Sequence, residues 1–297
     1  MINRFKNSIS NNIGNSIGII GCGWLGTALA EELLKNNIAV QVTVTNETKV
    51  DLLAKKNIEA NILTLPSMPA LLNKHPIFNQ QKIVICFPPQ LKNQQQDYPE
   101  KIAQCVFAAE QNGVSEIILI STSSIYNGLS GKVTEQTKLN FSAKKVSILN
   151  EAEQQLTLFS GKATIIRFAG LIGPERHPGR FLLKKSCFEN PDGIINLIHQ
   201  QDAVGIILTL LKRPSLTNIV DDKKTNAITV YNGASATHCT REQFYQKAAA
   251  AINLPFPHFK KPLSPVLSKE ICSDHVRKSL SYQFIFDDLL AWLEYSL

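Results

Sequence analysis

Short apolar runs alternate with amphipathic stretches between residues 16 and 168 of the chain. The amphipathic stretches have helical periodicity, as in Leu25, Ala28, Leu29 and Leu33. Buried strands that alternate with helices favour parallel strands joined by right-handed crossovers. The pattern therefore predicts an α/β protein with a Rossmann-like, doubly wound parallel sheet. The runs that predict its strands are 16–20, 40–45, 58–63, 82–87, 116–121 and 163–168.

After Gly173 the pattern loosens into loops rich in Pro, Gly, His and Arg. Asp202 precedes an apolar helical stretch, and we expect it to be the N-cap of a helix over 202–211, with His199 before it in a structural role. Further elements are predicted near 194–198, 229–232, 241–252 and 287–295. The predicted parts of the chain are a flexible tail (1–15), a nucleotide-binding core (16–172) and a smaller C-terminal part that completes the sheet and caps the substrate site (173–297).

A glycine motif, G-x-G-x-x-G, lies between the first predicted strand and the first predicted helix, the context that gives such a motif meaning. Gly21 would make the tight turn, Gly23 would admit a pyrophosphate to the backbone, and Gly26 would let helix and strand pack closely. The helix N-terminus offers N–H groups and a partial positive charge to phosphates. A purely structural turn is the alternative, but the context favours a bound dinucleotide, NAD or NADP. The motif consists of Gly21, Cys22, Gly23, Trp24, Leu25 and Gly26.

The end of the second predicted strand bears on which dinucleotide is bound. An acidic residue there would grip the ribose hydroxyls of NAD, but this chain has Thr45 and Asn46, with Glu47 slightly late. A 2′-phosphate would not be repelled by Thr45 or Asn46, so NADP is slightly preferred over NAD. The fourth strand ends at Phe87-Pro88-Pro89, where contact with the adenosine or ribose is expected.

Composition and charge narrow the possible classes of protein. The net charge is +7, but the basic residues fall in scattered doublets, with no basic stripe for nucleic acid. No apolar run reaches the roughly 18 residues that span a bilayer. The six cysteines include no C-x-x-C pair, which argues against a metal site or a disulfide framework and fits a reducing cytosol. We therefore expect a soluble cytoplasmic protein without nucleic-acid or membrane partners; no feature specifies its substrate or oligomeric state.

The order of motifs resembles the extended short-chain dehydrogenase/reductase superfamily, the NAD-dependent epimerase/dehydratase family, and most closely its atypical YeeZ-like branch. The resemblance implies a catalytic hydroxyl at Thr122 and cofactor contacts at Ser121 and Ala169. Local capping of a strand end by residues 121–124 is the alternative for these hydroxyls. The matching stretches, besides the glycine motif, are 121–126 (STSSIY), 167–174 (RFAGLIGP), 177–181 (HPGRF) and 196–202 (NLIHQQD).

The chain departs from the family at its catalytic Tyr-x-x-x-Lys, because no tyrosine here has a lysine four residues later. Alignment on residues 153–156 places Lys145 at the Tyr position and Leu149 at the Lys position. A missing general acid typically costs about 10²–10⁴-fold in rate. Tyr126 is the candidate replacement.

Two residues of a Pro/Gly-rich loop, His177 and Arg180, are candidates to hold a substrate anion, with an exposed polar loop as the alternative. The leading hypothesis is an NAD(P)-dependent oxidoreductase or epimerase-like enzyme acting on a small carbonyl, alcohol or sugar-nucleotide-like substrate. The alternative is a cofactor-binding redox sensor or scaffold without turnover.

Overall fold

The computed structural model describes residues 16–91, 96–184, 187–213, 228–262 and 266–295. The predicted tail over 1–15 lies outside these ranges. Within them, no helix is long and apolar enough to cross a membrane.

A seven-stranded sheet forms the centre of the fold, in the order β11-β7-β5-β4-β1-β2-β3. Its α/β, Rossmann-like class is the predicted one, and all six strands predicted between residues 16 and 168 are present. Strand order reverses at β1, which pairs in parallel with β2 on one side and with β4 on the other. Ligands of such sheets lie beyond the carboxyl ends of the strands at this reversal. The strands are β1 (Ile17–Ile20), β2 (Val40–Val44), β3 (Glu59–Ile62), β4 (Lys82–Ile85), β5 (Glu116–Thr122), β7 (Lys162–Phe168) and β11 (Thr229–Gly233).

The chain forms two compact units that interleave along the sequence. As far as their residues are described, the first comprises Met1–Ile120, Ile148–Ile165 and Leu211–Thr229, and the second comprises Ser121–Ser147, Ile166–Leu210 and Val230–Leu297. The chain passes from one unit to the other several times.

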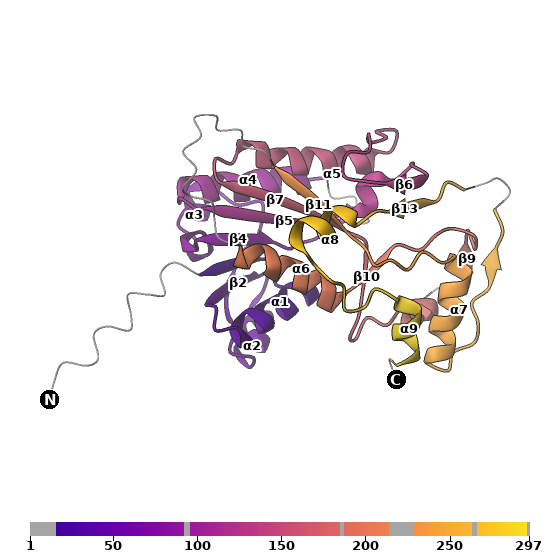
Figure 1. Cartoon of the computed structure of the whole chain (residues 1–297). Helices are drawn as coiled ribbons and strands as arrows, with labels where there is room; N and C mark the ends of the chain where they lie inside the picture. The colour runs from indigo at the N-terminus through magenta and orange to yellow at the C-terminus, as the bar shows by residue number, and fades with distance from the viewer. Residues whose placement is uncertain (1–15, 92–95, 185–186, 214–227, 263–265, 296–297) are drawn as a thin grey trace. The chain divides into compact units, whose positions relative to one another are not determined.

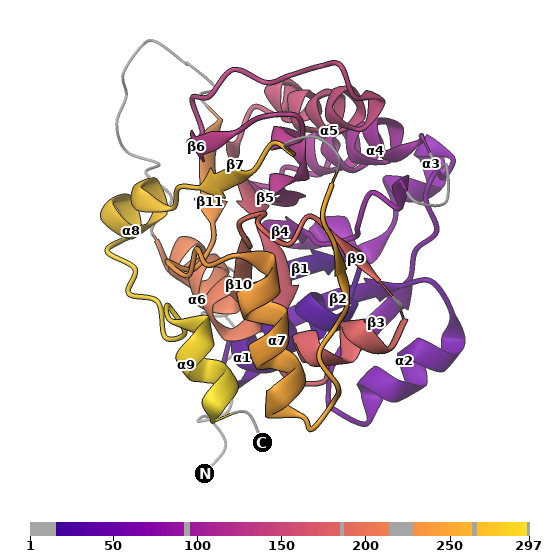
Figure 2. The same ribbon diagram turned by 90° about the vertical axis from the view of Figure 1, so that its right-hand side faces the viewer.

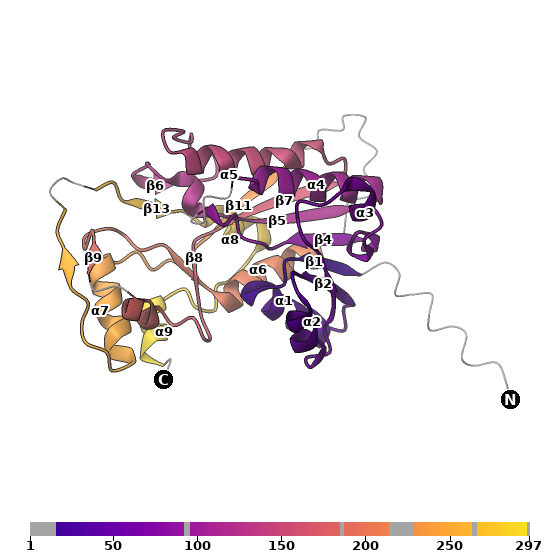
Figure 3. The same ribbon diagram turned by 180° about the vertical axis from the view of Figure 1, so that it is seen from behind.

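In the first unit, helices cover both faces of the strands. Figures 1 and 3 show α1 (Trp24–Lys35) and α2 (Glu47–Ala54) on one side of β1 and β2, and α4 (Tyr98–Gln111) on the other. Every residue of β1 is buried, as expected for a strand covered on both faces. The short helix α3 (Pro69–Leu72) and most of α5 (Lys144–Gln154) complete this unit.

A buried carboxylate at the start of β5 holds two lysines of the first unit. Glu116 is fully buried, and its oxygens lie 3.0 Å from Lys82 Nζ and 2.7 Å from Lys162 Nζ. Lys82 Nζ also donates to the carbonyl of Leu211 at 2.8 Å. Since an isolated buried charge is costly, these groups depend on one another.

The second unit consists of short strands and helices around a separate apolar cluster. Helices α7 (Arg241–Ala251) and α9 (Leu289–Glu294) lie side by side in Figure 2 and bury Phe244, Leu289 and Leu293 against Ile172. This unit also contains most of α6 (Gln200–Lys212), α8 (Asp274–Leu280), β6 (Gly131–Val133), β8 (Gly170–Ile172), β9 (Phe188–Glu189), β10 (Leu197–His199), β12 (Phe259–Lys260) and β13 (Lys269–Ile271).

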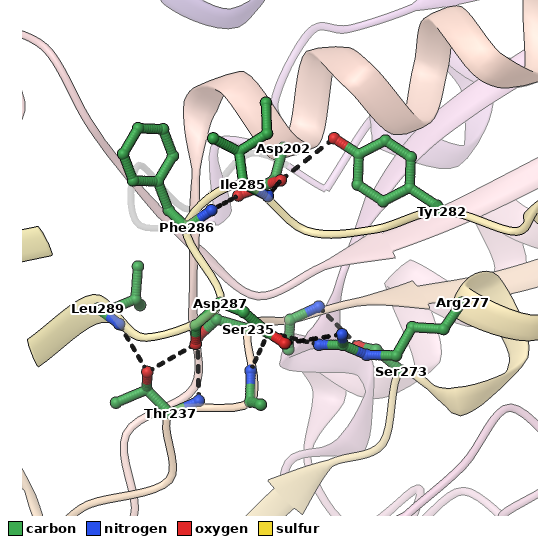
Figure 4. Close-up of polar contacts among 12 residues, drawn as sticks. Asp202, Ser235, Thr237, Ser273, Arg277, Tyr282, Ile285, Phe286, Asp287 and Leu289 are labelled. Atoms are coloured by element: carbon green, nitrogen blue, oxygen red, sulfur yellow. Dashed lines mark hydrogen bonds and ion pairs between the residues drawn. The ribbon is translucent and has the colours of Figure 1, made fainter. Parts of the chain in front are cut away.

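The predicted role of Asp202 as an N-cap is wrong. Helix α6 begins two residues earlier, at Gln200, and the ring Nδ1 of His199 accepts the Gln201 N–H at 3.2 Å. The buried Asp202 carboxylate instead accepts the backbone N–H groups of Ile285 and Phe286, at 2.7 and 2.9 Å (Figure 4). A periodic pattern cannot reveal this contact, because its donors lie more than 80 residues away in the sequence.

A second carboxylate, Asp287, holds the same C-terminal segment that Asp202 contacts. The Tyr282 hydroxyl donates to Asp202 at 3.1 Å, and the Asp287 carboxylate accepts from Arg277 and from the Ala236 N–H. Figure 4 shows these two carboxylates holding residues 282–289 against the rest of the second unit. Two buried or half-buried acids thus fix the path of the chain before α9.

Replacing the buried acid of the first unit should destabilise the fold. In Glu116→Gln, Lys82 stays buried without its carboxylate, so the free energy of unfolding should fall by about 3–5 kcal/mol. Glu31→Gln is the control, because it removes an exposed ion pair with Lys56 at 2.7 Å and should cost less than about 1 kcal/mol. Urea denaturation of both variants checks this, and equal losses would contradict the assigned role of Glu116.

Candidate functional site

The turn after β1 is held by contacts that only glycine permits at its first position. Gly21 has φ +91°, and a Cβ there would lie 2.8 Å from the backbone N of Phe87. The Gly21 N–H donates to Thr43 Oγ1 at 3.0 Å, and the Cys22 N–H donates to the Thr43 carbonyl at 2.7 Å. The turn is therefore hydrogen-bonded to β2 and lies against Phe87, in the segment that follows β4.

The third glycine is also favoured by packing. A Cβ on Gly26 would lie 3.1 Å from the Gly21 carbonyl oxygen and 3.3 Å from Ile19 Cγ2. Gly26 is buried in the first turn of α1, so its missing side chain lets the helix approach β1 closely. This is the role that the sequence motif predicts.

The middle glycine differs, because nothing in the described structure requires it. Gly23 is exposed, its φ of −94° suits any residue, and a Cβ there would meet no atom within 4 Å. Gly23 is the N-cap of α1, has no side chain to cap it, and is followed by no acidic residue in the first turn. Such an N-terminus is suited to an anion, as the phosphates of a dinucleotide are, and no protein atom occupies the position of a Cβ on Gly23.

The intervening residues of the motif support the turn from inside. Leu25 is buried, Trp24 is half-buried, and Cys22 is buried with its Sγ 3.5 Å from Thr27 Oγ1. Burial raises the pKa of the Cys22 thiol, so it is a poor nucleophile. These contacts leave the backbone of the turn as the surface available to a ligand.

Thr43 was missed by the sequence reasoning, although its side chain fixes the turn. It is 2 % exposed and stands between two buried valines of β2, Val42 and Val44. A hydroxyl buried in such a strand needs a partner, and that was the available signal.

The end of β2 offers no carboxylate at the positions where one would grip a ribose. Thr45 and Asn46 are exposed, and Asn46 caps α2 by accepting the Lys49 N–H at 3.1 Å. Helix α2 begins at Glu47, because the Asn46 cap initiates it there. Glu47 therefore belongs to the first turn of α2, and the geometry leaves room for a 2′-phosphate beside Thr45 and Asn46.

The segment after β4 lies against the glycine turn. Phe87 contributes the backbone that excludes a side chain at Gly21, and its ring packs edge-on against Tyr98, with the ring centroids 5.8 Å apart. Pro88 and Pro89 follow, exposed and half-buried respectively. The structure thus brings together the glycine turn and the Phe87-Pro88-Pro89 segment.

In the second unit, the end of β5 supplies the hydroxyls that the family resemblance singles out. Thr122 is half-buried, and its Oγ1 accepts the Ser124 N–H at 3.2 Å, so it caps the short 3₁₀ turn 123–126. Ser121, the first of the two residues expected to contact the cofactor, is buried. The second is Ala169, whose backbone N–H donates to the carbonyl of Gly233 at 2.9 Å. Thr122 thus has the local capping contact, while its hydroxyl proton remains available to donate.

Tyr126, the candidate replacement for the missing catalytic tyrosine, lies in a buried polar cluster. Its hydroxyl donates to Asn232 Oδ1 at 2.9 Å and accepts from Arg167 Nη1 at 2.7 Å. Burial raises the pKa of this hydroxyl, while the Arg167 charge opposes the shift. Its assignment as a proton donor stays a prediction, and the structure shows its hydroxyl engaged within the protein.

The two candidate anion-binding residues of the Pro/Gly-rich loop have different environments. His177 is 8 % exposed; its Nδ1 accepts the Gly179 N–H, and burial lowers the pKa of its ring. Arg180 is exposed. Neither lines the cavity of about 300 Å³ that the second unit contains. That cavity is lined by Ser123, Ser124, Gly170, Asn190, Gly193, Ile194, Ile195, Asn196, Leu197, Arg241, Tyr245, Leu267, Ser268 and Lys269.

Comparison with known proteins agrees with this geometry. The model of a family described as NAD(P)H-binding matches residues 21–214, well over half of the chain. Protein YeeZ of Escherichia coli K12 is 28% identical over 280 residues, which cover 92% of this chain and 97% of YeeZ. The resemblance to the YeeZ-like branch is therefore confirmed.

Two solved structures share the fold at low sequence identity. UDP-glucose 4-epimerase of Thermotoga maritima superimposes with a TM-score of 0.74 at 14% identity, covering 94% of this chain and 96% of the epimerase. UDP-glucuronic acid 4-epimerase of Bacillus cereus, solved in complex with NAD, gives a TM-score of 0.71 at 16% identity with the same coverage. With the glycine turn and the family match, these findings establish that the chain belongs to the NAD(P)H-binding family and has the fold of the epimerase/dehydratase-type short-chain dehydrogenases/reductases.

Proposed function

We propose that this protein is an NAD(P)-dependent oxidoreductase of the epimerase/dehydratase type that acts on a small carbonyl or alcohol. The observation that carries the proposal is Gly23, a glycine that neither packing nor backbone conformation requires. A ligand that approaches the backbone there accounts for it, and the uncapped N-terminus of α1 favours an anionic one. When bound, the cofactor supplies hydride transfer at C4 of its nicotinamide.

The proposed cofactor contacts of the first unit are the residues of the glycine turn, Thr45, Asn46 and the segment Phe87-Pro88-Pro89. The absence of a carboxylate at positions 45 and 46 supports a slight preference for NADP over NAD. The assignments of Ser121 and Ala169 as further contacts rest on the family resemblance.

Thr122 is the proposed catalytic hydroxyl. Its Oγ1 already accepts the Ser124 N–H, so its proton can be donated to a substrate carbonyl or alcohol oxygen. Tyr126 is the proposed proton donor, and this proposal rests only on its position at the end of the 121–126 motif. Its contacts with Arg167 and Asn232 also suit a residue that positions the 121–126 segment.

The same contacts favour a second function, an NAD(P)-binding sensor or scaffold without turnover. A hydroxyl that is buried and doubly hydrogen-bonded is a poor proton donor to a substrate, and the chain has no Tyr-x-x-x-Lys. Turnover separates this alternative from the first, because both require a bound cofactor.

The glycine turn can be tested without disturbing the fold. Gly23→Asp should leave stability unchanged or slightly higher, because Asp is a good N-cap, but its carboxylate would meet the phosphates. We expect the Kd for NADPH and NADH, measured by fluorescence titration, to rise about 100-fold or more. Gly21→Ala is the contrasting variant and should destabilise the protein by about 1–3 kcal/mol, because of its positive φ and the contact with Phe87. Cofactor binding by Gly23→Asp at the affinity of the unchanged protein would contradict the proposal.

The catalytic role of Thr122 can be separated from its capping role by two substitutions. Carbonyl substrates are screened by the loss of NADPH absorbance, and kcat/KM is then compared among variants. Thr122→Ala should lower kcat/KM by about 10²-fold, whereas Thr122→Ser keeps the hydroxyl and should retain most of it. If both variants keep full activity, Thr122 only caps the turn, and tight cofactor binding without turnover on any substrate would favour the sensor.

A further inference from the structure

The cavity of the second unit is polar and positively charged. Two of its lining residues, Lys269 and Arg241, are cations, and none of its lining residues is acidic. Among the described residues, neither cation forms an ion pair with an acidic side chain. Clefts lined by one sign of charge concentrate the field and attract a ligand of the opposite charge.

Lys269 is held in place from both its backbone and its side chain. It begins β13, which pairs with β6, and the Asn196 side chain clamps this strand by donating to the Lys269 carbonyl and accepting the Ile271 N–H, at 2.8 and 2.7 Å. The Lys269 ammonium donates to Asn127 Oδ1 at 3.0 Å. That contact uses one of its three N–H donors, so others remain for a ligand.

Arg241 comes from a different element, the first turn of α7. Within the described part of the chain, its side chain makes one hydrogen bond, a long one of 3.4 Å from Nη1 to the carbonyl of Glu189. A guanidinium has five N–H donors arranged as a fork that suits carboxylate and phosphate. The Thr240–Gln243 capping box fixes the start of this helix and so the position from which Arg241 extends.

Neutral donors complete the lining. Ser268 Oγ accepts the Ile194 N–H at 2.7 Å, which leaves its own hydroxyl proton to donate. Ser123 and Ser124 line the cavity from the segment that also contains Thr122. Two cations and several hydroxyls without a carboxylate form the donor set that an oxyanion requires.

We propose that this cavity binds a small molecule through an anionic group, carboxylate or phosphate, held by Lys269 and Arg241. Its volume of about 300 Å³ is at the lower end of the roughly 300–1,000 Å³ of ligand pockets. It therefore suits a small acid or a sugar phosphate better than a complete nucleotide sugar. That this molecule is the substrate rests on the proposed function, whereas its binding does not.

The surroundings of Lys269 disfavour the charged form of its ammonium. Burial, and then the neighbouring charge of Lys145, lower the pKa of its ammonium. A carboxylate or phosphate beside Lys269 would oppose both effects and stabilise the charged form.

Calorimetric titration of the full-length protein tests the proposal. The probes are inorganic phosphate, ribose 5-phosphate and malate, with ribose as the uncharged partner. Lys269→Gln and Arg241→Gln each remove one charge, Lys269→Arg restores it, and Lys138→Gln is the matched control at an exposed lysine of the same unit. We expect each cavity variant to raise the Kd of the bound anions about tenfold or more, with no change in the control and partial recovery in Lys269→Arg.

The outcomes identify the type of anion, and they test anion binding by the cavity separately from the proposed NAD(P)-dependent function. Malate binding without phosphate binding identifies a carboxylate site, and the reverse identifies a phosphate site. The proposal would be overturned if both cavity variants kept the anion affinity of the unchanged protein, or if Lys138→Gln lost as much affinity as they do. It would also be overturned if ribose bound as tightly as ribose 5-phosphate. The cavity substitutions leave the glycine turn intact, so phosphate bound there contributes equally to every variant. Cofactor titration of the same samples shows separately whether the proposed function fails.

Discussion

The close contact between Gly21 and the backbone of Phe87 is the constraint on which the nucleotide-binding end of the first unit depends. A side chain at Gly21 would overlap Phe87, and the positive φ of Gly21 adds to the demand for glycine. Thr43 fastens the same turn to β2. The ends of three neighbouring strands are thus locked together, and the N-terminus of α1 is presented with Gly23 facing open space. Rigid preorganisation of this kind reduces the ordering that binding would otherwise require.

Away from this turn, buried polar groups determine how distant segments meet. Glu116 links two lysines in the first unit, while Asp202 accepts backbone N–H groups of the C-terminal segment in the second. Each is costly if left unpaired, so each favours one arrangement of the chain over others. The cluster of Tyr126, Arg167 and Asn232 belongs to the same class of interaction.

The chemistry follows from what these contacts leave available. The glycine turn leaves backbone N–H groups for phosphates, the Thr122 hydroxyl keeps its proton, and the cavity leaves two cations without carboxylate neighbours in its lining. Tyr126, by contrast, has its hydroxyl engaged on both sides. The protein therefore has features suited to binding a cofactor and a small anion. For proton transfer, of the two candidate hydroxyls only that of Thr122 keeps a proton to donate.

The sequence alone determined the fold class and the glycine turn, because both depend on local periodicity and on residues adjacent in the chain. The apolar runs predicted the strands, and Gly21, Gly23 and Gly26 lay in the context that gives the motif meaning. The tertiary structure decided what depends on distant partners: Asp202 is an anchor rather than a cap, and Thr43 fixes the turn. Lys269 and Arg241, 28 positions apart, meet at one cavity, which no local pattern could indicate, because side-chain convergence depends on how strands and helices pack.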